Sequence, residues 1–230
     1  MGAGGVVVPP RTYWQKIQAV LQKYDILLVA DEVICGFGRT GKMFGSETYG
    51  MKPDMMVMSK QLSSSYLPIS ALMINEKVYG PIADESSRIG TLGHGFTAGG
   101  HPVAAAVALE TLKIIDERGL VAHAAEMGAR LQTGLRRLSG HPLIGEVRGV
   151  GLIAAIELVA DKATRKGLDP VGKLGGLVNG LLQKQGVISR NMGDALAFCP
   201  PLIINATEID EILSRLGRAL DDAGTELGIR

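Results

Sequence analysis

The chain has 230 residues, 46% of them hydrophobic, which suits one large domain or two small ones with a buried core. Its 24 basic and 23 acidic side chains nearly balance, which argues against nucleic-acid and anionic membrane partners. The two cysteines, Cys35 and Cys199, lie far apart and outside any C-x-x-C pattern, so we expect no disulfides and a cytoplasmic location. No apolar run approaches the roughly 18 residues of a membrane span, and no signal-peptide pattern marks the start.

The N-terminal part of the chain predicts a helix followed by a strand, as in α/β proteins. The first ten residues, MGAGGVVVPP, resemble the end of a strand and loop, so we expect the chain to start within a larger fold. Apolar residues at helical spacing then predict a helix, namely Trp14, Ile17, Leu21 and Tyr24. The continuous apolar run from Ile26 to Ala30 predicts a parallel strand that is covered on both faces.

Two charged residues follow predicted strands and are the first candidates for a site. Strands are predicted from Met55 to Met58 and from Ala71 to Ile74; Asp31 follows the first apolar run, and Lys60 follows Met55–Met58. The chain between Asp31 and Lys60 is long enough for one crossover between parallel strands, so both can face one crevice. A carboxylate and an amine placed together there suit pyridoxal phosphate, although position alone favours a surface lysine.

The C-terminal part changes from helices to a mixed pattern. Two helical faces predict a long helical connector, with Val103, Val107, Leu112 and Ile115 on the first and Met127, Leu131, Leu135 and Leu138 on the second. A strand from Leu152 to Leu158 and a helix ending near Gly186 are expected next. Residues 187–190 and 195–199 predict a hairpin, and Thr207 is expected to cap the last helix, with Asp210 in its first turn.

Three ordered motifs carry a resemblance to a known family. They are DILLVADEVICGFGRTGKMFGSE (residues 25–47), SKQLSSSYLPISALM (59–73) and HGFTAGGHPVAAAVALE (94–110). The chain resembles the C-terminal half of class III aminotransferases, and within them the ω-amino acid or amine:pyruvate branch. The resemblance implies an α/β fold of the aspartate aminotransferase type (fold type I). It also implies a partial cofactor-binding large domain (1–115), a connecting helix (116–140) and a small α+β domain (141–230).

The same resemblance implies roles for four residues of the cofactor site. Lys60 matches the lysine that forms the Schiff base with pyridoxal 5'-phosphate, and Asp31 matches the partner of the pyridinium nitrogen. Val33 matches the residue that packs on the cofactor ring, a role compatible with that of a core valine. Thr97 matches the threonine that reaches the phosphate held by the neighbouring subunit, which implies a homodimer with shared active sites; an ordinary turn hydroxyl is the alternative. Many relatives carry glutamine where this chain has Ile34.

Arginine placement distinguishes the keto acids that relatives accept, because its planar fork binds a carboxylate in bidentate fashion. Relatives that use 2-oxoglutarate carry an arginine in an RFxPPL-like motif, whereas this chain reads AFCPPL with Ala197 in that place. Arg190, on the preceding hairpin strand, matches the mobile arginine of the ω-amino acid:pyruvate branch, so pyruvate is the expected acceptor. A solvated hairpin arginine is the alternative. Arg39 and Arg148 are expected to serve structure through carbonyl or carboxylate contacts.

These patterns predict an aminotransferase that moves an amino group from an ω-amino acid or primary amine to a keto acid. The four histidines lack metal-ligand spacing, so no metal is expected. Two alternatives stay open: a pyridoxal phosphate-dependent decarboxylase or aminomutase on the same scaffold, and a truncated fragment without catalysis.

Overall fold

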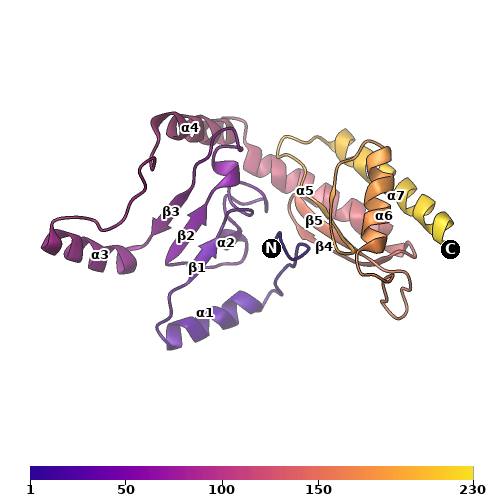
Figure 1. Cartoon of the computed structure of the whole chain (residues 1–230), viewed down its shortest axis with the longest axis horizontal. Coiled ribbons are helices and arrows are strands. Elements are labelled where there is room, and N and C mark those ends of the chain that lie inside the picture. The colour runs from indigo at the N-terminus through magenta and orange to yellow at the C-terminus, as the bar shows by residue number, and fades with distance from the viewer. Residues whose placement is uncertain (230) are drawn as a thin grey trace. The chain divides into compact units, whose positions relative to one another are not determined.

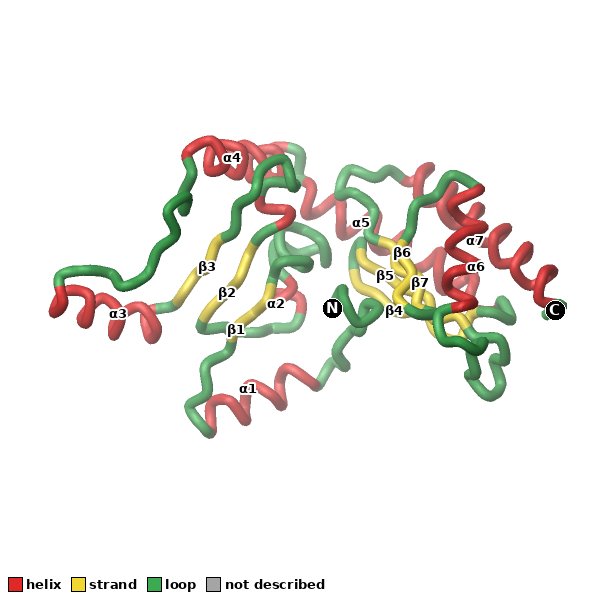
Figure 2. The backbone as a smooth tube through the Cα atoms, in the orientation of Figure 1, coloured by secondary structure: helices red, strands yellow, loops and turns green. Residues whose placement is uncertain are grey.

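The computed structural model describes residues 1–229 and divides into two compact units (Figures 1 and 2). The N-terminal unit comprises Pro9–Gly38 and Lys42–Leu120. The C-terminal unit comprises Met1–Val8, Arg39–Gly41 and the chain from Val121 onward. The domain boundaries that the resemblance implies after residues 115 and 140 stay a prediction.

A three-stranded sheet forms the centre of the N-terminal unit, with the strand order β1-β2-β3. Strand β1 (Val29–Asp31) runs parallel to β2 (Met55–Met58), and β3 (Ala71–Ile74) runs antiparallel to β2. The predicted bounds of β2 and β3 are confirmed. The helices of this unit are α1 (Tyr13–Lys23), α2 (Gly45–Thr48), α3 (Glu76–Ile89) and α4 (Pro102–Glu117), with the 3-10 turn η1 (Lys60–Leu62) after β2. The predicted first helix is confirmed as α1, whereas α3 was not foreseen.

The first strand differs from its prediction in length and in burial. Ile26 and Leu27 precede β1, and Ile26 is 51% exposed. The expectation of a strand from Ile26 to Ala30 covered on both faces is therefore wrong. Among the described residues, Leu27 and Val29 are also left 42% and 48% exposed, so this run lacks cover, and β1 has a strand partner on one side only.

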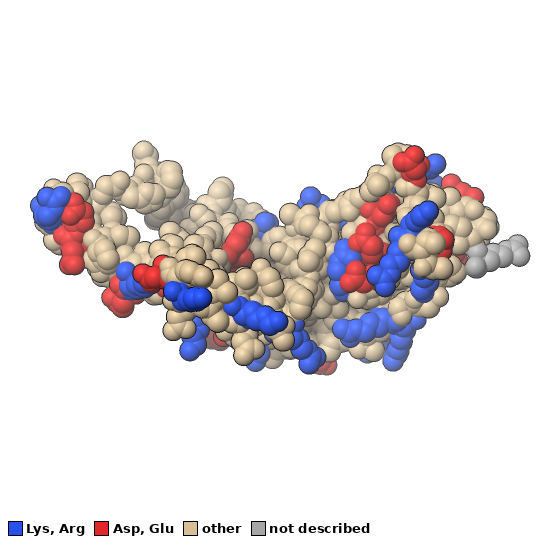
Figure 3. Space-filling view, turned by 90° about the horizontal axis from the view of Figure 1, so that it is seen from below, with Lys and Arg blue, Asp and Glu red and all other residues tan. Residues whose placement is uncertain are grey.

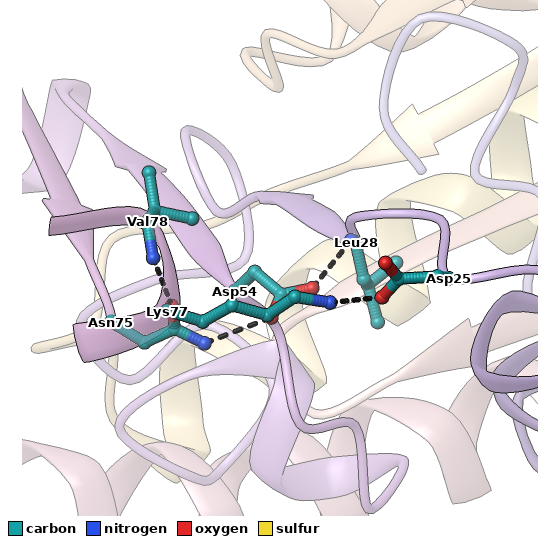
Figure 4. A network of polar contacts seen from close by, with 6 residues as sticks. All are labelled: Asp25, Leu28, Asp54, Asn75, Lys77 and Val78. Atoms are coloured by element: carbon teal, nitrogen blue, oxygen red, sulfur yellow. Dashed lines mark hydrogen bonds and ion pairs between the residues drawn. The ribbon is translucent and has the colours of Figure 1, made fainter. Parts of the chain in front are cut away.

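A polar network joins α3 to the end of this sheet at which β1 and β2 begin (Figure 4). The Asp54 carboxylate accepts hydrogen bonds from the Leu28 backbone N–H (2.8 Å) and from the Asn75 side-chain amide (2.8 Å). Asn75 also caps α3, and Lys77 in the first turn pairs with Asp25. The Leu28 N–H, followed by the Asn75 amide, holds the pKa of Asp54 below its usual value because both donors favour the ionised carboxylate.

The C-terminal unit contains a four-stranded antiparallel sheet in the order β4-β5-β7-β6. Its strands are β4 (Ile144–Val150), β5 (Ile153–Leu158), β6 (Arg190–Met192) and β7 (Ala195–Phe198). Its helices are α5 (Leu120–Arg137), α6 (Lys173–Lys184) and α7 (Ala206–Leu227), with the 3-10 turn η2 (Leu138–Gly140). Fully buried side chains of this core include Leu131, Leu135, Ile153, Ile156, Leu174, Leu182, Leu196 and Leu216. The predicted hairpin is present as β6–β7, but its first strand is Arg190–Met192 and not 187–190, so Asn191 and Met192 lie in the strand.

Two helical details correct the expectations from sequence. Asn205, not Thr207, caps α7: its side chain accepts from the Glu208 N–H while Glu208 accepts from the Asn205 N–H, so Thr207 lies inside the helix. Helix α4 buries a different face from the predicted one. Its buried residues are Ala104, Ala108, Thr111 and Ile115, of which only the last was expected.

Arg39 and Arg148 serve structure, as predicted. The Arg39 guanidinium donates to the carbonyls of Leu152 (3.1 Å) and Pro200. Arg148 pairs with Glu157 (2.6 Å) and donates to the Gly5 carbonyl (2.7 Å). Both guanidinium groups therefore join segments that are far apart in the chain.

Close backbone contact between glycines also joins segments of the C-terminal unit. Gly151, in the turn between β4 and β5, has φ +56° and lies against Thr40 and against Gly128 of α5. A Cβ atom at Gly128 would lie 2.5 Å from the Gly151 carbonyl carbon, closer than real Cβ contacts. Glycine is required at both positions for this approach.

Within residues 1–229, no helix is long and apolar enough to cross a membrane. The same residues contain no group of three or more His, Cys, Asp or Glu side chains that could hold a metal ion. Basic and acidic side chains are both scattered over the face shown in Figure 3, with uncharged areas between them.

Candidate active site

Asp31 and Lys60 lie at the same end of the sheet in the N-terminal unit, where the parallel strands β1 and β2 finish. Strands β1 and β2 are parallel, and Asp31, the last residue of β1, is paired with Val57 of β2. The chain leaves β2 after Met58, and Lys60 begins η1. Because neighbouring parallel strands finish at the same end of a sheet, the Asp31 carboxylate and the Lys60 amine both lie at the carboxyl ends of their strands. Open α/β sheets bind ligands at this position.

Lys60 has an unusual backbone conformation and an exposed side chain. Its φ is +42°, a left-handed value that a residue with a Cβ adopts only at a cost. The Lys60 carbonyl accepts hydrogen bonds from the N–H groups of Ser63 (3.3 Å) and Ser65 (3.2 Å), which close a tight turn. Among residues 1–229, its Nζ has no hydrogen-bond or ion-pair partner. The amine is therefore available for a ligand.

The hydroxyl groups around Lys60 hold this turn in place. Ser63 Oγ donates to the Leu67 carbonyl (2.7 Å), and Ser59 Oγ donates to the Ile69 carbonyl (3.1 Å). Both bonds lie within the loop that joins β2 to β3. These serines therefore stabilise the backbone that carries Lys60.

The Asp31 carboxylate is held by the backbone that follows it. Its Oδ1 accepts a hydrogen bond from the Val33 N–H (3.0 Å), and Asp31 has no ion pair within the described part of the chain. The side chain is exposed, and that of Val33 is half-buried. The second carboxylate oxygen is thus left for a donor outside the described residues.

Glu32, next to Asp31, is a structural acid that the sequence analysis missed. Its side chain is 3% exposed and accepts hydrogen bonds from the N–H groups of Gly45 (2.9 Å) and Ser46 (2.6 Å). The two donors begin α2, so Glu32 satisfies the free N–H groups of that helix end. The alternation of faces along β1 is the signal that separates an exposed Asp31 from a buried Glu32.

Thr97 lies in the connection between α3 and α4, away from any structural partner in the described residues. Every residue from Gly90 to Val103 is exposed, and no hydrogen bond of the Thr97 hydroxyl is found within residues 1–229. The hydroxyl is therefore not used to hold its own loop. Within residues 1–229, no hydrogen bond joins Thr97 to Asp31 or Lys60.

Arg190 begins β6 in the C-terminal unit and is paired directly with Ala197 of β7. Directly opposed residues of antiparallel strands project to the same face, so Arg190 extends from the face that Ala197 occupies with a methyl group. The Arg190 side chain is exposed and has no ion pair among residues 1–229. Glu146 and Glu157 are both paired with Arg148 instead.

The comparisons with known proteins agree with this geometry. A solved structure described as a transaminase with L-Ala is 67% identical, with a TM-score of 0.97, over 99% of this chain and 54% of its own. The ω-transaminase from Pseudomonas jessenii in complex with PMP is 61% identical, with a TM-score of 0.96, over 99% of this chain and 50% of its own. The fold is therefore that of the fold type I, pyridoxal phosphate-dependent transaminases.

The family follows from the sequence comparisons. The model of class-III aminotransferases matches residues 1–220, and the chain belongs to this pyridoxal phosphate-dependent family. A γ-aminobutyrate transaminase 3, chloroplastic, from Solanum lycopersicum is 46% identical over 96% of this chain and 43% of its own length. The chain thus spans about half the length of the curated relatives it matches.

The residues described above fit the family's cofactor. An amine without a partner and a carboxylate with one uncommitted oxygen follow neighbouring parallel strands. These are the groups that pyridoxal phosphate requires for its aldehyde and its ring nitrogen. Ile34 offers no polar contact of the kind that glutamine provides in many relatives.

Proposed function

We propose that the protein is an aminotransferase that moves an amino group from an ω-amino acid or primary amine to pyruvate. The observation that supports this most is the unpartnered Lys60 amine beside the carboxyl end of β1, within the motifs of the family. The names of relatives favour a donor with a terminal amine, since they include γ-aminobutyrate and ω-transaminases.

In this proposal Lys60 and Asp31 divide the chemistry. Pyridoxal phosphate, when bound, supplies the electron sink that stabilises negative charge at the amino-bearing carbon of the donor. Lys60 Nζ would hold the cofactor through its aldehyde, and the same amine, when not bonded to the cofactor, would take the proton from that carbon of the donor. Asp31, with its Oδ1 fixed by the Val33 N–H, would hold the ring nitrogen of the cofactor through its other carboxylate oxygen. Val33 would contact the ring.

Arg190 is proposed to bind the carboxylate of the acceptor. Its planar guanidinium can hold a carboxylate through two parallel hydrogen bonds. Ala197, directly opposite, adds no second guanidinium for the distal carboxylate of 2-oxoglutarate. The absence of an ion pair at Arg190 within the described residues supports this role, and a single arginine favours pyruvate.

We further propose a homodimer with shared active sites in the cytoplasm. The exposed Thr97 hydroxyl is suited to reach the cofactor phosphate of a neighbouring subunit, because nothing described in its own chain bonds to it. The cytoplasmic location rests on the cysteine usage alone.

Lys60→Ala tests the central assignment in the full-length protein. We expect the variant to lose the visible absorbance of covalently bound pyridoxal phosphate and its transaminase activity, because no amine remains to bond the aldehyde. Lys52→Ala is the matched control, since Lys52 is another exposed lysine of the same unit. Retention of the visible band in Lys60→Ala would reject Lys60 as the cofactor-binding lysine.

The acceptor dependence of turnover separates the proposal from its alternatives. An aminotransferase stops after one half reaction when no keto acid is supplied, whereas an aminomutase continues. A decarboxylase releases carbon dioxide from the donor. A protein that neither binds the cofactor nor converts a donor in either assay would support the alternative of a truncated fragment without catalysis.

A further inference from the structure

Both neighbours of Arg190 are tied to one residue of helix α6. Asn179 Oδ1 accepts a hydrogen bond from Ser189 Oγ (2.6 Å), and Asn179 Nδ2 donates to Asn191 Oδ1 (3.1 Å). The side chains of Ser189, Asn191 and Asn179 are all half-buried, so water competes only partly for these bonds. One amide thus holds the chain immediately before and immediately after Arg190.

The two hydrogen bonds set the face of the strand from which the Arg190 side chain extends. Successive side chains in an extended strand point to opposite faces, so tying Ser189 and Asn191 to α6 directs Arg190 away from α6. This is the face that Ala197 shares across the hairpin. The guanidinium itself is left without a partner in the described chain.

Few other contacts hold this segment. Strand β6 has three residues and lies at the edge of the sheet, paired with β7 alone. Ile188, just before it, is 93% exposed, and the chain enters from Gly186 with φ +81°. The backbone at Arg190 therefore depends on β7 from one side and on Asn179 from the other.

We propose that Asn179 is a positioning residue for carboxylate recognition, acting through the backbone on both sides of Arg190. The inference rests on the proposed function of Arg190 as the group that binds the acceptor carboxylate. Asn179 does not touch the substrate in this account. It limits the orientations that Arg190 samples, so that less conformational entropy is lost when a carboxylate binds.

Asn179→Ala in the full-length protein is the main test. Removing both hydrogen bonds should raise the KM for pyruvate about tenfold, because each bond contributes a factor of several. The kcat at saturating pyruvate, and the KM for a primary amine donor that has no carboxylate, should stay unchanged. Binding of propionate as a carboxylate probe, measured by calorimetry, should weaken by the same factor.

Three further variants keep the test specific. Asn179→Asp should retain near-normal pyruvate KM, because the new carboxylate still accepts from Ser189 and the Asn191 amide can turn to donate to it. Ser189→Ala removes one of the two bonds and should give an intermediate effect without loss of folding. Gln183→Ala, an exposed position on the same helix, is the control and should change nothing.

Arg190→Ala separates failure of this inference from failure of the proposed function. If Arg190→Ala leaves the pyruvate KM and propionate binding unchanged, the proposed role of Arg190 is wrong. If Arg190→Ala weakens both while Asn179→Ala weakens neither, the positioning role is overturned. If Asn179→Ala raises the KM for the amine and lowers kcat by factors similar to its effect on the pyruvate KM, the positioning role is also overturned, since a general structural defect gives that result.

Discussion

At the scale of single residues, two adjacent acids at the end of β1 have opposite environments. Asp31 is exposed and keeps one oxygen uncommitted, whereas Glu32 is buried and gives both oxygens to the first N–H groups of α2. The Glu32 N–H also bonds to the Val57 carbonyl (2.9 Å), which extends the pairing of β1 with β2 by one residue. Glu32 therefore fixes the backbone from which Asp31 projects.

Glu32→Gln should lower the free energy of unfolding by about 1–3 kcal/mol, because a buried N–H would then face an amide NH₂ instead of a carboxylate oxygen. Urea unfolding followed by circular dichroism measures the change. Glu126→Gln, at an exposed position of α5, is the control and should shift the midpoint little. An unchanged midpoint for Glu32→Gln would show that these hydrogen bonds add no net stability.

The sequence offers candidate site residues more readily than the contacts that support them. Asp31 and Lys60 became candidates because each follows a short apolar run and because the motifs around them resemble those of a family, and their roles stay a prediction. The alternation along β1 indicates that Glu32 is buried, but the partners of its carboxylate could not be predicted, since they belong to α2, a four-residue helix whose N–H groups become donors only in the folded loop. The Asn179 contacts likewise join α6 to a strand edge that periodicity cannot pair.

At the scale of elements, glycines on two helices have opposite surroundings. Gly128 of α5 lies against the Gly151 backbone, whereas a Cβ atom added at Gly176 of α6 would have no other atom within 4 Å. Both lie inside helices, where glycine is unfavourable relative to alanine. Only the first glycine is required by packing.

Paired alanine substitutions measure this difference. Gly176→Ala should raise the free energy of unfolding by about 0.5–1 kcal/mol through helix propensity alone. Gly128→Ala should lower it by about 1–3 kcal/mol, because the new methyl group overlaps the Gly151 backbone and must displace it. Thermal unfolding of both variants checks the signs, and stabilisation by Gly128→Ala would show that α5 can move without cost.

The two strands whose bounds the sequence predicted correctly, β2 and β3, have clear ends. The runs that became β2 and β3 are short and apolar, and each is bounded by polar or turn-forming residues. Strand β4 was missed because Gly145 and Gly149 interrupt its apolar alternation. Helix α3 was missed because it contains Pro81 and buries no residue. The face of α4 was misassigned because packing there selects small residues, whereas periodicity was read from large ones.

At the scale of the whole molecule, the two units differ in how well they cover their sheets. In β5, five of six residues are buried. In β3, the neighbouring residues Leu72 and Met73 are each 58% exposed, and they point to opposite faces. Both faces of β3 are therefore open among the described residues, which is unusual for apolar side chains of this size.

A polypeptide of these 230 residues, prepared alone, should bind the hydrophobic dye 8-anilinonaphthalene-1-sulfonate in native buffer and self-associate. Contiguous exposed apolar surface and an open strand edge favour both outcomes. Dye fluorescence and light scattering measure them, and replacing Leu72 and Met73 by lysine should reduce both signals. A monomer that binds no dye would show that these side chains are covered in solution.

The order of segments in the C-terminal unit has a consequence for synthesis on the ribosome. Met1–Val8 and Arg39–Gly41 are synthesised before the rest of their unit, which begins at Val121. Arg39 therefore meets its carbonyl partners on Leu152 and Pro200 only after residues 42–200 have been translated. Because domains generally form as their residues emerge, this unit can close only after Pro200 has emerged, whereas the sheet that carries Asp31 and Lys60 can assemble before it.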